Sequence, residues 1–236
     1  MAIQIPLWFY GFSSLTYIIA AFVGVLLTFF SYNLYKLTGR REHKFLFYSM
    51  AFLTLGFLIV TFSNIFGLFH FQRCFPACQF DMTDPNYSLL IKGGNYAYYI
   101  TSFFGYIFLA MTYLKTIRLD KIFDKYLVMV PLSIPLLMDT LQHGFLYPFD
   151  NFVFQLFHLL SIVIMSYINF NTVTNYLVLK TKNSFPVMIA FLFIGAFHFL
   201  MALTPFWPII FVTAHILLLA GLVSLLWMLI QVNKVG

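Results

Sequence analysis

Three histidines lie inside long apolar stretches of the sequence: His158, His198 and His215. Each is six residues from one end of its stretch, which is a depth of about 9 Å in an α-helix that rises about 1.5 Å per residue. The stretch with His198 would run opposite to the other two, so all three reach one level. Asp139 lies close to that level. We therefore predict a polar site formed by these four side chains.

This set of side chains has the composition of a metal site. Imidazole suits zinc, copper or iron, and a carboxylate can complete four-coordination. Histidines from different helices can also bind a haem iron as axial ligands. Two other interpretations stay open. Each neutral histidine could make one hydrogen bond to a neighbouring helix, or the cluster could sense pH or relay protons.

The elements that carry these residues are predicted to be membrane-spanning helices. The chain is 62% hydrophobic and 8% charged, whereas soluble domains are about half apolar and about a quarter charged. Its apolar stretches are long enough to cross a hydrocarbon core about 30 Å thick, and they lack the alternating pattern of barrel strands. We predict an all-α, single-domain bundle of seven transmembrane helices. Their approximate bounds are 10–35, 45–69, 95–114, 126–141, 152–177, 185–204 and 209–231.

The basic residues predict the orientation of the bundle. Of 13 lysines and arginines, 11 fall in connections on one side or at the C-terminus, and such connections stay cytoplasmic. The N-terminus is therefore expected outside and the C-terminus in the cytoplasm, as in a multi-pass protein of the cell membrane. No basic stretch is interleaved with aromatic residues as a nucleic-acid groove would need. The expected surroundings are the lipid bilayer, with membrane-protein partners or a homo-oligomer as further possibilities.

A second polar series follows His158 in the fifth predicted helix. It contains Asn169, Asn171 and Asn175. Asn169 is eleven residues, or about three turns, from His158, so these two residues share a helix face. The series predicts a polar interior path, and the alternative is that these side chains join neighbouring helices by hydrogen bonds.

The predicted outer loop, about 25 residues from His70 to Gly94, holds both cysteines. His70, Cys74 and Cys78 follow one another at four-residue steps. Because oxidation is permitted outside the cytoplasm, a disulfide between Cys74 and Cys78 is the first interpretation. A surface copper or zinc site formed by the same three residues is the second.

Two short segments suggest an internal repeat. "AFLTLG" at 51–56 is echoed by "AFLFIG" at 190–195. A true repeat would make the first three and last three helices parallel units joined by the fourth helix, as in some transporters.

Seven helices with the N-terminus outside resemble the microbial rhodopsins in topology alone. Retinal attachment in that family requires a lysine in the middle of the last helix, but the only lysine there is Lys234, at its inner end. No acidic counter-ion occurs between Asn95 and Leu114. The sequence therefore indicates that this is not a retinal-binding protein.

No catalytic or nucleotide-binding motif is found in the sequence. We expect a binding or sensing protein, or a subunit of a membrane assembly, that uses the polar site with or without a metal or haem. A small-solute transporter of three, one and three helices is the alternative. A membrane-embedded metalloenzyme is the second alternative.

Overall fold

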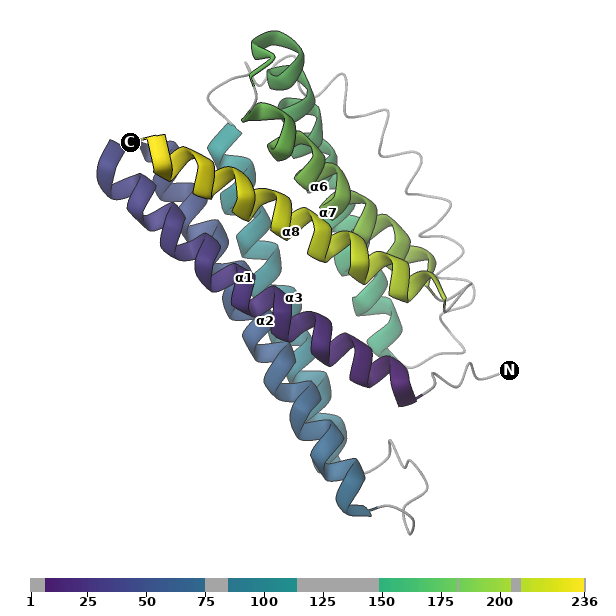
Figure 1. Ribbon diagram of the computed structural model, residues 1–236. Helices are drawn as coiled ribbons and strands as arrows, with labels where there is room; N and C mark the ends of the chain where they lie inside the picture. The colour runs from purple at the N-terminus through teal and green to yellow at the C-terminus, as the bar shows by residue number, and fades with distance from the viewer. Residues whose placement is uncertain (1–6, 75–84, 114–148, 182, 205–208, 236) are drawn as a thin grey trace.

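The computed structural model of the protein is all-α, and it describes residues 7–74, 85–113, 149–181, 183–204 and 209–235 (Figure 1). Six helices occur in these ranges. They are α1 (Leu7–Thr38), α2 (Arg41–Cys74), α3 (Pro85–Tyr113), α6 (Phe149–Leu179), α7 (Ser184–Leu203) and α8 (Ile210–Val235). Each coincides with one predicted span. The fourth predicted span, with Asp139, lies outside the described residues.

Five of these helices are long and apolar enough to cross a membrane: α1, α2, α6, α7 and α8. The protein is therefore a multi-pass helical membrane protein. Helix α3 does not belong to the five, because polar residues such as Asn95, Thr101 and Ser102 lower its hydropathy. It nevertheless packs between α2 and α6, so its polar residues are covered by other helices.

The six helices form a closed ring, in which each packs against the next and α8 returns to α1. Tyr106 and Tyr113 of α3 contact α7 in reverse order, at His198 and Phe191, so α3 and α7 are antiparallel. His158 and Tyr176 of α6 also contact α7 in reverse order, at His198 and Phe185. Helices α3 and α6 therefore run parallel, and the end of α3 and the start of α6 lie at opposite ends of the ring (Figure 1).

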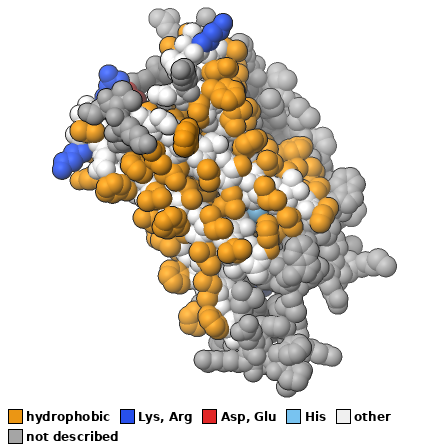
Figure 2. Space-filling view, in the orientation of Figure 1, with side chains coloured by type: hydrophobic (Ala, Val, Ile, Leu, Met, Phe, Trp, Pro, Cys, Tyr) orange, Lys and Arg blue, Asp and Glu red, His pale blue; other side chains and the backbone are white. Residues whose placement is uncertain are grey.

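Of the six basic side chains that the structure describes, all but Lys92 gather at one end of the ring. Four lie around the connection between α1 and α2 (Lys36, Arg40, Arg41 and Lys44), and Lys180 lies between α6 and α7. Because α1 and α6 point the same way, both connections are at the same end. The face seen in Figure 2 has this pattern, with blue side chains at its upper edge and an apolar surface below. An apolar belt with charge at its end is the surface expected of a protein in a bilayer.

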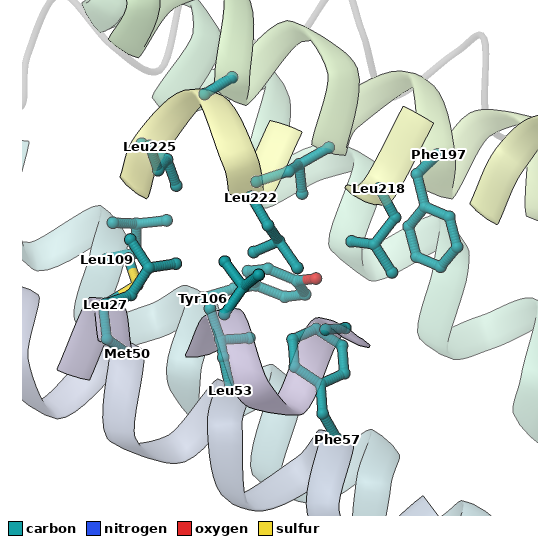
Figure 3. Packing of buried hydrophobic residues seen from close by; sticks show 14 of the residues in the cluster. Leu27, Met50, Leu53, Phe57, Tyr106, Leu109, Phe197, Leu218, Leu222 and Leu225 are labelled. Atoms are coloured by element: carbon teal, nitrogen blue, oxygen red, sulfur yellow. The ribbon is translucent and has the colours of Figure 1, made fainter. Parts of the chain in front are cut away.

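The core lies where α8 faces α1, α2 and α3. Leu218, Leu222 and Leu225 of α8 point toward Leu53 and Phe57 of α2, with Tyr106 between the two sides (Figure 3). In α7 the buried residues recur every three or four positions, which is the spacing of one helix face. They are Ala190, Phe191, Ile194, Phe197, His198, Met201 and Ala202. Both His198 and Phe197 are therefore held on the inner face of α7.

Two glycines set the close approach of the helices that carry the histidines. A Cβ atom at Gly221 of α8 would lie 2.9 Å from the backbone oxygen of Ala190 in α7. A Cβ atom at Gly195 of α7 would lie 2.6 Å from the side-chain nitrogen of Asn169 in α6. Small residues permit such contacts between membrane helices. Helices α6, α7 and α8 therefore pack closely enough for short side chains to meet.

The predicted outer loop is much shorter than expected. Helix α2 continues to Cys74, and α3 begins at Pro85, a residue type favoured at the first helical position. Only residues 75–84 separate the two helices, in place of the predicted 25. The prediction was wrong because it ended each helix where hydropathy falls, whereas a helix can continue beyond the hydrocarbon. His70 and Cys74 belong to the last turns of α2, and Cys78 lies outside the described residues.

The two echoed segments do not occupy equivalent positions. Leu53 in α2 is 5% exposed, but its counterpart in α7, Leu192, is 40% exposed. Conversely, Leu55 is 47% exposed and its counterpart Ile194 is 3% exposed. A structural repeat would place matched residues on matched faces. The similarity of these segments therefore reflects composition and not a repeat in this register.

Candidate functional site

A hydrogen-bonded chain of three side chains crosses the interior from α3 to α7 and α6. The hydroxyl of Tyr106 lies 2.7 Å from Nε2 of His198. Nδ1 of His198 in turn lies 2.9 Å from Nδ1 of His158. All three side chains are at most 2% exposed. His158 and His198, which the depth argument predicts at one level, therefore form a direct pair.

Aromatic rings enclose the histidine pair. Phe154 and Phe157 of α6 lie 4.5 and 5.0 Å from the His158 ring, between centroids, and Phe197 lies 4.8 Å from the His198 ring. Of the side chains that the structure describes, the only acidic one is Glu42, in the first turn of α2. Because an unpaired charge is costly in such surroundings, the neutral form of both imidazoles is the resting form.

The two neutral imidazoles can share their hydrogens in two ways. In the first, Tyr106 donates to Nε2 of His198, and His198 donates from Nδ1 to His158. In the second, His158 donates from Nδ1 to His198, and His198 donates from Nε2 to the Tyr106 oxygen. Each arrangement satisfies both contacts, because a neutral imidazole has one donor and one acceptor nitrogen. The chain can therefore change its polarity without losing a hydrogen bond.

His215 lies apart from the pair. Its Nδ1–H donates to the backbone oxygen of Phe211 at 2.8 Å, so Nε2 is left as an acceptor. That Nε2 is buried and has no hydrogen-bond partner among the residues that the structure describes. The ring of Phe197 contacts both His215, at 5.7 Å, and His158, at 5.9 Å. Phe197 therefore links the third histidine to the pair by ring packing alone.

Within the described ranges, no group of three or more metal-ligating side chains is arranged to hold an ion. Two nitrogens bound tetrahedrally to zinc at about 2.0–2.1 Å would be about 3.4 Å apart. The shorter separation of the histidine pair, 2.9 Å, is that of a direct hydrogen bond. Asp139, the fourth predicted ligand, lies outside these ranges.

The three asparagines of α6 differ from one another in their contacts. Asn171 is buried and donates to the backbone oxygen of Tyr167 at 2.8 Å, within its own helix. Asn169 lies against Gly195 of α7, and its Oδ1 is buried without a partner among the described residues. Asn175 is half-buried. Asn169 is therefore the asparagine whose side chain lies at a helix interface near the site.

Two tyrosines of the site are not predicted from sequence. Tyr106 completes the hydrogen-bonded chain, and the ring of Tyr17 in α1 lies 5.3 Å from that of His215. Tyrosine carries little signal in a chain with 15 of them. Depth along α3 is the one signal that could select Tyr106, because it lies well inside that helix.

Comparison with known proteins gives no family for this chain. No protein-family model, curated protein or solved structure matches it at a significant level. The chemistry of the buried side chains is therefore the guide to function.

Proposed function

We propose that this protein is a membrane-embedded sensor in which proton uptake by the His158–His198 pair loosens the packing of α3, α6 and α7. The observation that carries the proposal is the buried hydrogen-bonded chain from Tyr106 to His158. Histidine is the side chain whose charge changes near neutral pH. A pair that joins three helices can convert that change into movement.

The number of bound protons determines whether the hydrogen bonds from Tyr106 to His158 remain intact. One added proton turns His198 into an imidazolium that donates from Nδ1 to His158 and from Nε2 to the Tyr106 oxygen. Every contact is then kept. A second proton puts N–H groups on both Nδ1 atoms, so the pair loses its acceptor and two like charges face each other. Double protonation must therefore separate the two rings.

Even one charge favours rearrangement, because no described acidic side chain faces the pair. Among the described residues, Tyr106 from α3 is the only other titratable group in direct contact with it, and His215 is on the far side of Phe197. A charge at this place is stabilised only if water or a counter-charge reaches it. Acid therefore biases the bundle toward a state in which α6 and α7 have moved apart.

The proposal includes seven spans, with the pair nearer the outer side. The parallel directions of α3 and α6 support one further crossing between Tyr113 and Phe149. The basic connections support a cytoplasmic position for the end of α1 and the start of α7. His158 lies in the first third of α6 and His198 in the last third of α7. External acid would therefore have the shorter path to the pair.

Spin labels on α6 and α7 would test the proposal. Leu160 and Phe199 are 43% and 51% exposed, so both can be changed to labelled cysteines after Cys74 and Cys78 are replaced by serine. Pulsed electron paramagnetic resonance in nanodiscs should show a longer distance gaining population between about pH 8 and about pH 4. His158→Gln/His198→Gln should remove this response, because glutamine forms hydrogen bonds without taking up a proton.

His43→Gln is the matched control, because His43 lies in the first turn of α2, at the other end of the bundle from the pair. It should leave the pH response unchanged. A distance distribution that does not change with pH in the wild-type protein would contradict the sensor. The same conclusion follows if the control variant loses the response.

A second candidate is a proton-coupled small-solute transporter, favoured by the helix directions. Helices α1–α3 and α6–α8 pass through the bundle in the same order of directions, as three-plus-one-plus-three transporters require. Liposomes with a trapped pH-sensitive dye separate the two candidates. Transport predicts proton flux that His198→Gln abolishes, whereas a sensor changes its conformation without flux.

A further inference from the structure

A groove of about 500 Å³ lies between α1 and α2, on the surface that faces the bilayer. Its walls are apolar and include Val25, Phe29 and Tyr32 of α1 and Phe47, Leu55 and Leu58 of α2. Val25, Phe29, Tyr32 and Leu55 are 46–57% exposed. The volume is within the range of about 300–1,000 Å³ for ligand sites, so the groove can hold an apolar chain.

The polar atoms at the floor of the groove are already paired. The hydroxyls of Thr28 and Thr54 lie 3.1 Å apart, and each donates to a backbone oxygen of its own helix, at 2.8 and 2.7 Å. The groove therefore needs no polar group from its occupant. A hydrocarbon chain satisfies it fully.

The end of the groove leads to a cluster of basic residues. Tyr32 and Phe47 lie at this end, with ring centroids 5.4 Å apart. Lys36 follows Tyr32 by four residues, and Lys44 precedes Phe47 by three, so each lysine continues its wall by about one turn, or about 5.4 Å. Arg40 and Arg41 lie between them in sequence, and Glu42 is the one acidic residue there. With four basic residues and one acidic residue, this end of the groove carries a net positive charge.

We propose that this surface binds an anionic phospholipid, with its phosphate on Lys36 and Lys44 and one acyl chain in the groove. A hydrocarbon groove that ends in two lysines matches a molecule with an apolar chain and a negative head. The cluster would lie at the membrane boundary, because it begins where α1 ends. Lys44 has its ammonium 5.7 Å from the Tyr48 ring centroid, which keeps its stem along the helix at this level. A zwitterionic lipid offers the same chain but no net negative charge.

Native mass spectrometry of the full-length protein tests the site. The purified protein is mixed with equal amounts of phosphatidylglycerol and phosphatidylcholine that carry the same acyl chains. The wild-type protein should retain phosphatidylglycerol preferentially. Lys36→Gln/Lys44→Gln should lower its retention about tenfold or more, because each lysine near an anionic group contributes about 1 kcal/mol.

Lys92→Gln/Lys180→Gln is the matched control, because it removes the same charge at exposed sites away from the groove. It should change retention by less than about twofold. Equal losses in the two double variants would overturn the proposal, as would equal retention of both lipids by the wild-type protein. Circular dichroism of each variant shows that the helices are intact.

A third variant tests the groove separately from the charges. Ala51 lines the groove, so Ala51→Trp fills it while both lysines remain. Retention of phosphatidylglycerol should fall, because the acyl chain loses its place. Unchanged retention would mean that the head group binds without the groove, and would refute the site as proposed.

Discussion

The buried threonines in the first half of the ring and the buried histidine pair in the second half find their hydrogen-bond partners in different ways. In α1–α3, the hydroxyls of Thr28, Thr54 and Thr101 each donate to the backbone oxygen four residues earlier in the same helix. In α6–α8, the imidazoles of His158 and His198 bond to each other and, through His198, to Tyr106 of α3. These threonines are thus satisfied within their own helices, whereas the histidine pair is satisfied between helices.

The difference follows from side-chain length. A threonine hydroxyl reaches the preceding turn of its own helix, so it is hydrogen-bonded without a partner from a neighbouring helix. An imidazole has two nitrogens on opposite sides of a ring, and its own helix can satisfy only one, as with His215 and Phe211. The histidine pair of the second half therefore depends on specific partners, and we expect it to tolerate substitution less well than the threonines.

The largest expected effect is that of His198→Ala. The change empties a buried site and leaves both the Tyr106 hydroxyl and Nδ1 of His158 without their present partner. We expect a loss of about 3 kcal/mol in the free energy of unfolding, measured by reversible unfolding in mixed micelles. A loss as small as that of a threonine variant in α1–α3 would remove the distinction between the halves.

Substitution of glycine by alanine gives an intermediate effect that also differs between the halves. At Gly221 the new methyl group would meet the Ala190 backbone oxygen at 2.9 Å, and we expect a cost of about 2 kcal/mol. At Gly56 it would first meet the side-chain oxygens of Thr101 and Ser102, at 2.8 and 2.9 Å, and side chains shift more easily than a backbone, so we expect a smaller cost of about 1 kcal/mol.

Gly93→Ala is the control for these two variants, since a Cβ atom there has no neighbour within 4 Å. It should not destabilise the protein, because alanine is the better helix former. Thermal unfolding followed by circular dichroism gives the order of the three. A greater loss at Gly56 than at Gly221 would show that α2 and α3 are the more rigid pair.

The smallest effect is expected for the removal of one hydroxyl. Thr54→Val leaves Thr28 bonded to its own helix, so the cost should be about 0.5 kcal/mol or less. Tyr106→Phe also removes one hydroxyl, but it takes the partner of His198 Nε2 and should cost about 1 kcal/mol. Unfolding under the same conditions compares the two variants, and equal costs would argue against a special role for the hydrogen-bonded chain from Tyr106 to His158.

Much of the fold can be predicted because lipid leaves the backbone few choices. Apolar stretches that cross the bilayer must satisfy their own hydrogen bonds, so six predicted spans coincide with helices. The wrong length of the outer loop has a local cause, because the helices around residues 75–84 extend beyond their apolar stretches. Helix α3 is not among the five most apolar helices, and it packs against α2 and α6.

The sequence predicts the depth of the site residues along their helices, but not the direction in which their side chains point. Counting residues places three histidines at one level, and two of them meet. The third is separated from them by Phe197 because the rotation of α8 turns His215 toward Tyr17 of α1. Rotation depends on contacts with neighbouring helices, such as Gly221 against Ala190. Such contacts join residues far apart in the sequence, so no local pattern reports them.

The return of α8 to α1 also has a consequence for biosynthesis. His215 packs against Phe12 and Tyr17, residues made about 200 positions earlier. During synthesis α1 enters the bilayer long before this partner exists, so its inner face must meanwhile be covered by lipid or by the insertion machinery. The ring of the six described helices can therefore close only after α8 has been made, and synthesis that stops before α8 would leave it open.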